Sequence, residues 1–210
     1  MKRFTDLAAL IKAFGSNGSL INADLSYLSI EGIDFQDTVL EGASIHGCTL
    51  TNVKLEGCNL SGIFVQDCVF TRVTLTRAQL TGAFFQRVDF SDVPFTGSTL
   101  ISASFFLCGM KSADLTDCEM REVKILESNL EGADCTGSNM HGANLMDSDL
   151  SGVKFHNCDL RQADFRKTNM FSASFVNIQA QGALYYGKSP WDGQANPEDW
   201  GKKMTVFDGE

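Results

Sequence analysis

The feature that most constrains the fold of this chain is a repeat of five residues. Cut into fives, residues 131–150 read EGADC, TGSNM, HGANL and MDSDL, so that every block closes on an apolar residue. The same register runs without a slip from residue 16 to residue 185, and all 34 closing positions, from Leu20 to Tyr185, are apolar. A period of five matches neither the 3.6 residues of a helical turn nor the two-residue alternation of a strand. The repeat therefore predicts a structure that turns at regular intervals.

The third residue of each quintet is small or β-branched, with Leu28 as the exception. Residues 16–185 include 31 charged residues, and none of them stands at a third or fifth position. Charged side chains stay in water because burying an unpaired charge is costly. We therefore expect the third and fifth residues to face inward and the other three to face solvent.

The second residue of each quintet predicts a corner. Twelve of the 19 glycines fall at this position, and Asn or Asp fills ten more of the 34 second positions. These residue types tolerate positive φ and form tight turns. Each quintet is then a very short strand followed by a corner, and equal corners at equal spacing wind the backbone into a coil. Successive coils stack through strand-type hydrogen bonds at roughly 4.8 Å.

Several quintets share the order Ala, then Asp or Asn, then Leu or Phe, as in Ala23-Asp24-Leu25, Ala113-Asp114-Leu115, Ala143-Asn144-Leu145 and Ala163-Asp164-Phe165. In this motif the chain resembles the pentapeptide-repeat family. The resemblance implies an all-β solenoid, namely a right-handed quadrilateral β-helix with four quintets per coil. At that count the chain would form about eight coils and a rod of roughly 40 Å. Every fourth closing residue from Leu20 to Leu160 is Leu or Met, which is compatible with four sides.

The quintets divide the chain into three expected segments, with the β-helix itself at residues 16–186. Residues 1–15 form an N-terminal helical cap, because the apolar residues at 7, 10, 11 and 14 have helical spacing and Gly15 can end a helix. The capping helix is expected over residues 4–14.

Residues 187–210 form a C-terminal cap or tail. The segment Asn196-Pro197-Glu198-Asp199 is typical of a helix start, so a short helix is expected there. The resemblance to quinolone-resistance members of the family implies an alternative, in which this end is a dimerisation surface formed by Leu184, Tyr186, Trp191 and Trp200.

The cysteines and histidines do not predict a catalytic site or a metal site. Six cysteines occupy third positions and Cys135 a fifth position, so all seven are expected to point inward as small apolar fillers. His46, His141 and His156 occupy first positions on three different sides, and no histidine is placed to act as the base for a serine nucleophile. We therefore expect no enzyme activity, no metal and no cofactor.

The sequence also bears on the compartment. No apolar run approaches the ~18 residues of a membrane span, and the N-terminus lacks the features of a secretory signal. Free thiols fit a reducing compartment. We expect a cytoplasmic bacterial protein without a membrane span. A secreted bacterial effector is an alternative, because the resembling fold also occurs among such proteins.

The net charge of −9 argues against direct nucleic-acid binding, which needs clustered Lys and Arg. Residues 16–70 and 111–150 each carry a net charge of −6, whereas 71–110 carry +1 and 151–185 carry +2. Some members of the resembling family present an acidic rod to topoisomerases, so an acidic DNA mimic that binds DNA gyrase is a further alternative. The quintets here run unbroken, without the insertions of the loop-bearing quinolone-resistance members.

One side of the expected rod is apolar. Fifteen large apolar residues stand at outward positions, and nine of them share a side if sides repeat every twenty residues: Tyr27, Phe64, Phe84, Phe106, Leu107, Leu126, Met146, Leu184 and Tyr186. A contiguous exposed strip is typical of an interaction surface, whereas scattered surface apolar residues are normal. We expect a protein partner, or a second copy of the chain, to bind at Phe64, Phe84, Phe106, Leu107, Leu126 and Met146.

Overall fold

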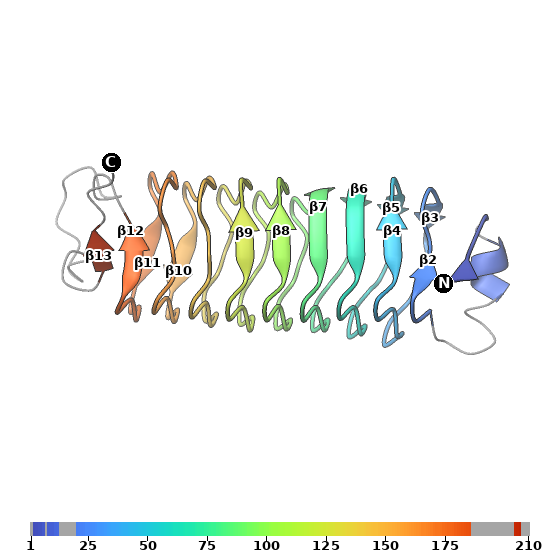
Figure 1. Ribbon diagram of the computed structural model, residues 1–210, viewed down its shortest axis with the longest axis horizontal. Coiled ribbons are helices and arrows are strands. Elements are labelled where there is room, and N and C mark those ends of the chain that lie inside the picture. The colour runs from blue at the N-terminus through green and yellow to red at the C-terminus, as the bar shows by residue number, and fades with distance from the viewer. Residues whose placement is uncertain (1, 7, 13–19, 186–203, 207–210) are drawn as a thin grey trace.

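The computed structural model describes residues 2–6, 8–12, 20–185 and 204–206, and these form a rod (Figure 1). Between residues 20 and 185 the backbone pairs in parallel with partners twenty positions away, as Phe64 does with Phe84 and Ser104 with Lys124. Twenty residues with a corner every five make a coil of four sides, and about eight such coils stack along the rod. The expected quadrilateral β-solenoid is confirmed.

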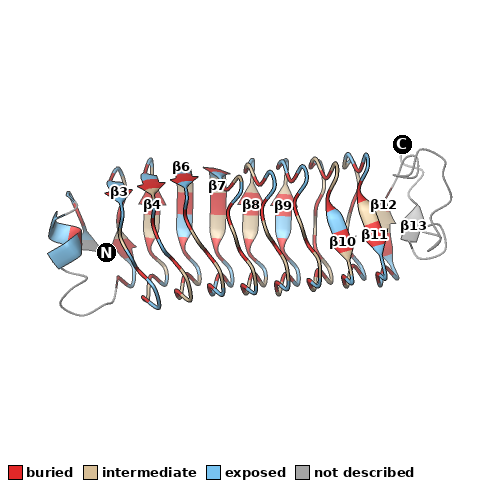
Figure 2. Cartoon of the chain, turned by 180° about the vertical axis from the view of Figure 1, so that it is seen from behind, coloured by how far each residue is buried: buried red, intermediate tan, exposed pale blue. Residues whose placement is uncertain are grey.

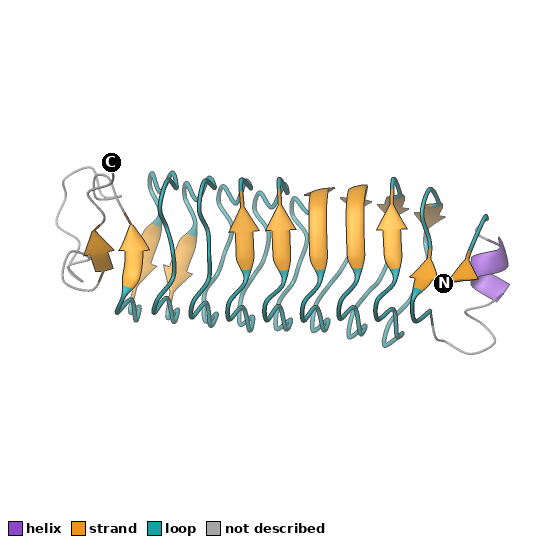
Figure 3. Cartoon of the chain, viewed as in Figure 1, coloured by secondary structure: helices purple, strands orange, loops and turns teal. Residues whose placement is uncertain are grey.

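The strands are short and turns join them (Figure 3). In the described residues they are β1 (Lys2–Arg3), β2 (Ala23–Asp24), β3 (Ser29–Glu31), β4 (Ser44–His46), β5 (Thr49–Thr51), β6 (Phe64–Thr71), β7 (Phe84–Asp89), β8 (Ser104–Phe106), β9 (Lys124–Leu126), β10 (Lys154–His156), β11 (Ser174–Val176), β12 (Ala183–Tyr185) and β13 (Met204–Val206). Strands β2, β4, β6, β7, β8 and β9 follow one another along one side of the rod. Isolated bridges at every coil continue the ladders between them.

The corners lie where the sequence predicts them. Every second position from Asn22 to Gly182 has a positive φ, between 50° and 78°, in 12 glycines and 21 other residues. Bulky residues such as Arg72 and Leu107 take the same conformation as glycine. An L-residue in this region carries a strain of roughly 1–2 kcal/mol. The coils stacked on either side therefore impose the corner even where the residue type does not favour it.

The third and fifth residues form the core, as predicted. All 34 closing residues are buried, and among the described third residues only Ile33 and Thr168 are partly exposed. Buried and exposed segments alternate around each coil in Figure 2. Phenylalanines stack along the interior, with ring centroids 4.8 Å apart for Phe85–Phe105 and 5.0 Å for Phe155–Phe175.

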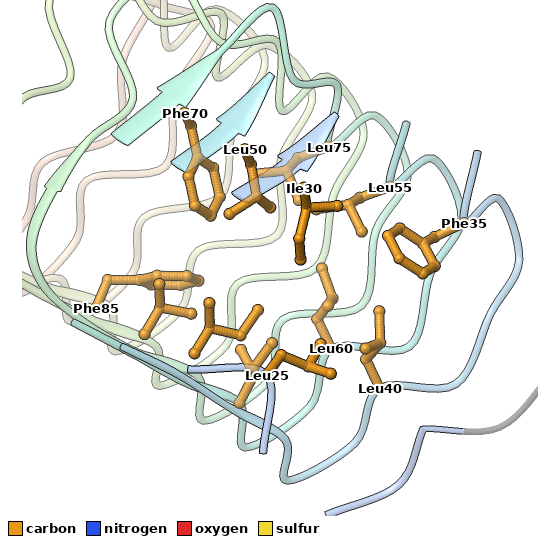
Figure 4. Close-up of a pocket in the computed structure, with 13 residues that line it drawn as sticks. Leu25, Ile30, Phe35, Leu40, Leu50, Leu55, Leu60, Phe70, Leu75 and Phe85 are labelled. Carbon is orange, nitrogen blue, oxygen red and sulfur yellow. The ribbon is translucent and has the colours of Figure 1, made fainter. Parts of the chain in front are cut away.

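A small cavity of ≈ 20 Å³ lies between the walls of the N-terminal coils. Figure 4 shows side chains such as Leu25, Phe35 and Phe85 pointing into this interior from different walls. The lining is entirely apolar, so a water molecule inside would find no hydrogen-bond partner. The cavity is therefore a packing gap and not a polar ligand site.

Polar third residues bridge one coil to the preceding coil. Third residues whose number ends in 3 are Ala, Val or Ile, whereas Cys, Ser and Thr occur only at those whose number ends in 8. Ser138 Oγ accepts the Cys118 amide at 2.9 Å and donates to the Leu115 carbonyl at 2.5 Å. Thiols donate in the same way, as Cys58 does to the Phe35 carbonyl at 2.9 Å. These side chains satisfy buried backbone groups, and an unsatisfied group would destabilise the wall.

The N-terminal end begins with a strand. β1 pairs in parallel with β2, and the Phe4 amide donates to the Asp24 carbonyl at 2.9 Å. Asp6 then caps a turn of helix, because its Oδ1 accepts the Ala9 amide at 2.7 Å. Of the described residues in this segment only 8–12 are helical, so the helix expected over 4–14 was wrong for residues 4–6. Phe4 and Leu10 are buried in the core cluster and cover the first coil.

At the C-terminal end, β13 pairs in parallel with β12, with Leu184 opposite Thr205. The repeat register contains no signal for this strand. It continues the same side of the rod that β1 begins, so a strand covers that side's edge at both ends. The helix expected at residues 196–199 lies outside the described residues, as do Tyr186, Trp191 and Trp200.

Candidate interaction surface

The centre of the predicted apolar side is a pair of stacked phenylalanines. Phe64 in β6 is in register with Phe84 in β7, and both side chains point outward because their neighbours Val65 and Phe85 close quintets and are buried. The two rings are parallel within 5°, with centroids 5.3 Å apart. Phe64 is 40% exposed and Phe84 is half-buried.

On the next three coils the apolar residues continue on the same side, but two positions further along the chain in each coil. Gln86 is in register with Phe106, and Phe106 with Leu126. The Glu127 amide donates to the Met146 carbonyl at 3.3 Å, which places Met146 on the coil after Leu126. Phe64, Phe84, Phe106, Leu107, Leu126 and Met146 thus form a band with one sideways step, and we call this band the apolar strip. It covers five coils, or about 19 Å of rod.

Three of the nine residues predicted for this side do not belong to the apolar strip. Tyr27 lies beside His46, with ring centroids 5.1 Å apart. Leu184 is half-buried and lies on the far side of Asp164 and Arg166, which occupy the coil between it and Met146. Tyr186 lies outside the described residues. The sequence grouped all nine because they share a side, but sharing a side does not require contact along it.

Apolar residues also stand singly on other sides of the rod. Phe171 is 58% exposed, Val176 51% and Val69 49%, more than any residue of the apolar strip. Within the strip, the stacked rings of Phe64 and Phe84 cover part of each other. The strip residues recur on five consecutive coils, whereas Val69, Phe171 and Val176 each follow a polar residue at the same position of the preceding coil.

Charged pairs lie beside the apolar strip. Arg87 donates from Nε and Nη2 to the two Asp67 oxygens at 2.5 and 3.0 Å, on the coils of the phenylalanine pair. The hydrogen-bonded guanidinium holds the pKa of Asp67 below its usual range. At the other end, Arg166 Nη2 is 3.8 Å from Met146 Sδ and 2.6 Å from Asp164 Oδ2. An apolar centre with a charged rim is typical of protein interfaces.

The described residues contain no cluster of three His, Cys, Asp or Glu side chains able to hold a metal. All seven cysteines are free and buried, as predicted. One expectation about chemistry needs correction, because His156 Nε2 lies 2.7 Å from Ser174 Oγ. The two residues come together because they stand one coil apart. No carboxylate within the described residues orients this imidazole, so the pair lacks the third member of a catalytic triad.

No helix among the described residues has the length and apolar character needed to cross a membrane. The family model described as pentapeptide repeats matches the chain in eight copies, at residues 19–57, 54–92, 113–152, 128–166 and 148–184. No curated protein shows a significant sequence match.

Among solved structures, a trypsin-treated variant of QnrB1, a plasmid-mediated fluoroquinolone resistance protein, is 18% identical with a TM-score of 0.59, and the match covers 88% of this chain and 92% of that one. Full-length QnrB1 is 22% identical with a TM-score of 0.54, covering 77% and 93%. HetL from Nostoc sp. strain PCC 7120 is 17% identical with a TM-score of 0.38, covering 92% and 100%. At these identities the likeness to QnrB1 establishes the fold and nothing beyond it.

Proposed function

We propose that this chain, which belongs to the pentapeptide-repeat family, is a non-enzymatic rod that binds another protein through its apolar strip. The observation that carries the proposal is the recurrence of apolar side chains on one side of five consecutive coils, from the stacked Phe64–Phe84 pair to Met146. Exposed apolar patches of this kind mark interaction sites in soluble proteins. Their aromatic residues supply most of the contact energy.

The rod geometry suits such a role. Four strip residues, Phe64, Phe84, Phe106 and Leu126, lie on strands β6 to β9, which pair with the backbone of the coils on both sides, so binding would not require the backbone to reorganise. A surface that is already ordered loses little conformational entropy when a partner docks. The charged pairs at its rim would stay partly in water and contribute orientation more than affinity.

Replacing Phe84 and Phe106 together with glutamate tests the proposal. We expect a loss of about 2 kcal/mol or more in binding, roughly thirtyfold in Kd, because two charges would enter a surface that must exclude water. Light scattering measures self-association, and capture from a bacterial lysate followed by titration measures partner binding. Unchanged association and capture would overturn the proposal.

The matched control replaces Val69 and Phe171 with glutamate. Both residues are at least as exposed as the strip residues but lie outside the strip. This control should bind like the unchanged protein. Melting temperatures of both variants check that the fold is retained.

A second candidate, the acidic mimic of DNA acting on gyrase, is favoured by the charge of residues 111–150. Asp117, Glu122 and Glu127 have no cationic partner among the described residues and stand on three successive corners, so negative charge surrounds the rod there. Other acids among residues 111–150 are paired with a base, as Asp134 Oδ2 is with Lys154 Nζ at 3.0 Å. This candidate expects inhibition of gyrase supercoiling that weakens with added salt. Absence of inhibition at large molar excess would remove it.

A further inference from the structure

Cys48 and Cys68 form a stacked pair of thiols. Among the seven cysteines, only these two occupy the same third position, on the same side, of consecutive coils. The strands on either side are in register, with His46 opposite Gln66 and Thr49 opposite Val69. This register places Cys48 directly opposite Cys68, and the Cys48 amide donates to Cys68 Sγ at 3.3 Å. Neighbouring coils are about 4.8 Å apart, which falls within the usual Cα separation of a disulfide.

The two sulfurs differ chemically from the other five. The neighbouring Cys68 thiol lowers the pKa of Cys48. The neighbouring Cys48 thiol, together with burial, raises the pKa of Cys68. Burial raises the pKa of Cys58 and Cys108 to about 11. Burial also raises the pKa of Cys118, Cys135 and Cys158. Of these thiols, Cys48 loses its proton most easily, so we expect the nucleophilic thiolate there.

We propose that Cys48 and Cys68 are a peroxide-oxidation site that closes to a reversible disulfide between two adjacent coils. The Cys48 thiolate attacks one oxygen of hydrogen peroxide, the O–O bond breaks, and Cys48 becomes a sulfenic acid while hydroxide leaves. The Cys68 sulfur then attacks the Cys48 sulfur, the S–O bond breaks, and the oxygen leaves as water. In total two thiols lose two hydrogens, and one peroxide becomes two waters.

The disulfide would join the coil of β4 and β5 to the coil of β6, which carries Phe64. It closes a loop of about twenty residues and so restricts the unfolded chain. The oxidised rod should therefore melt at a higher temperature than the reduced rod, and a thiol reductant should reverse the shift. Both sulfurs are almost fully buried, so oxidation should be slower than for an exposed thiol.

Peptide mapping of the full chain after peroxide treatment tests the proposal. Remaining thiols are alkylated in denaturant, and the chain is digested with trypsin without reduction. Cleavage after Lys12, Lys54 and Arg72 puts Cys48 in the peptide 13–54 and Cys68 in the peptide 55–72. We expect these two peptides to appear linked, with a mass lower by two hydrogens. Because Cys58 shares the second peptide, the same link must persist in a Cys58→Ser variant.

The Cys48→Ser and Cys68→Ser variants should lose the link. Both should fold, because serine occupies the equivalent third position on the same side at Ser128 and Ser148. If either variant fails to fold, the wild-type and Cys58→Ser maps still decide the question. Three results would overturn the proposal: all seven thiols staying reduced under peroxide that oxidises the denatured chain, a link between other cysteines, or oxidation of Cys48 to a sulfinic acid without a link.

Discussion

Single residues at the corners carry the conformational strain of this fold. The 21 non-glycine corners hold a positive φ that only glycine and, to a lesser degree, Asn and Asp adopt readily. Their side chains point into solvent, so packing does not compensate for the strain at each site. The compensation comes from hydrogen bonds to the next coil, such as the Asp92 amide donating to the Lys111 carbonyl at 2.9 Å.

Arg72 is a suitable site for measuring this strain, because its φ is 54° and its guanidinium has no ion-pair partner in the described residues. We expect Arg72→Asn to raise the free energy of unfolding by about 0.5–1 kcal/mol, since asparagine tolerates positive φ. Arg72→Val should lower it by roughly 1–2 kcal/mol, since β-branched residues are strained there. Urea unfolding monitored by circular dichroism gives both values.

Gln79→Val provides the control for the Arg72 series. Gln79 is exposed in the same coil but lies in an extended bridge, where valine is well tolerated. Its free energy of unfolding should stay within about 0.5 kcal/mol of the unchanged protein. An equal effect of valine at both positions would mean that the corner is not strained.

Single elements of this rod are too short to be stable alone, since most strands have three residues or fewer. Side chains at the fourth position of the quintets reinforce them locally. Asp159 Oδ1 accepts the Arg161 amide at 3.1 Å, and the Arg161 guanidinium binds both carboxylate oxygens. Asp114, Asp134 and Asn139 likewise accept a hydrogen bond from the backbone amide two residues later. This bond fixes the direction in which the next quintet starts.

The hydrogen bonds from Arg161 lower the pKa of Asp159, and so predict a pH dependence. A carboxylate with a lowered folded pKa stabilises the fold above its unfolded pKa, about 3.9, and loses that contribution as the pH falls through the folded value. Asp159→Asn keeps the acceptor for the Arg161 amide but removes the charge. We expect it to lower stability by up to about 1 kcal/mol near neutral pH, with the difference vanishing as the pH falls below the lowered folded pKa of Asp159. Thermal unfolding across this range measures the difference.

The control for this pH effect is a double-mutant cycle with Arg161→Gln. The two substitutions should be non-additive near neutral pH, because they remove the same ion pair, and additive in acid. A difference between Asp159→Asn and the unchanged protein that stays constant from neutral pH to acid would contradict the assignment.

The whole molecule is a linear stack in which each coil contacts only its neighbours. Such architectures depend on coverage of their two ends. At one end β1, Phe4 and Leu10 cover the first coil. At the other end β13 adds a strand to β12. These additions occupy the edges that would otherwise pair with another chain.

Truncation after residue 203 removes β13 and tests its role as a cap. We expect concentration-dependent association of the truncated chain, because the amide and carbonyl groups of β12 would lose their partner strand. Light scattering over a concentration series measures it, and truncation after residue 206, which keeps β13, is the control. Identical masses for the two truncated chains would contradict the cap. If the full chain is a dimer and truncation after residue 189 yields monomers, this end is a dimerisation surface instead.

Much of this structure could be predicted from the sequence, because the direction of each side chain repeats with its position in the quintet. The burial of Leu100 and the corner at Gly132 need only the register. The apolar strip could be predicted to share a side for the same reason. Its sideways step, from the position of Phe64 and Phe84 to that of Phe106, Leu126 and Met146, follows from the same register. The side-chain contacts at its ends, such as Tyr27 with His46 and Arg166 with Met146, could not be predicted, because the register does not fix side-chain conformations.

The sequence by itself determined the solenoid, its inward residues and its corners, since these follow from a rule that each quintet obeys alone. Only the tertiary structure decided which side chains from different coils meet, such as Cys48 with Cys68 and His156 with Ser174. It also showed that strands β1 and β13 cover the ends, although no repeat in the sequence predicts these two strands. The physical reason is the same in both cases. Contacts between coils join residues about twenty positions apart, so the pattern within a single quintet does not specify them. At the ends the periodic pattern stops, so it does not specify the strands there.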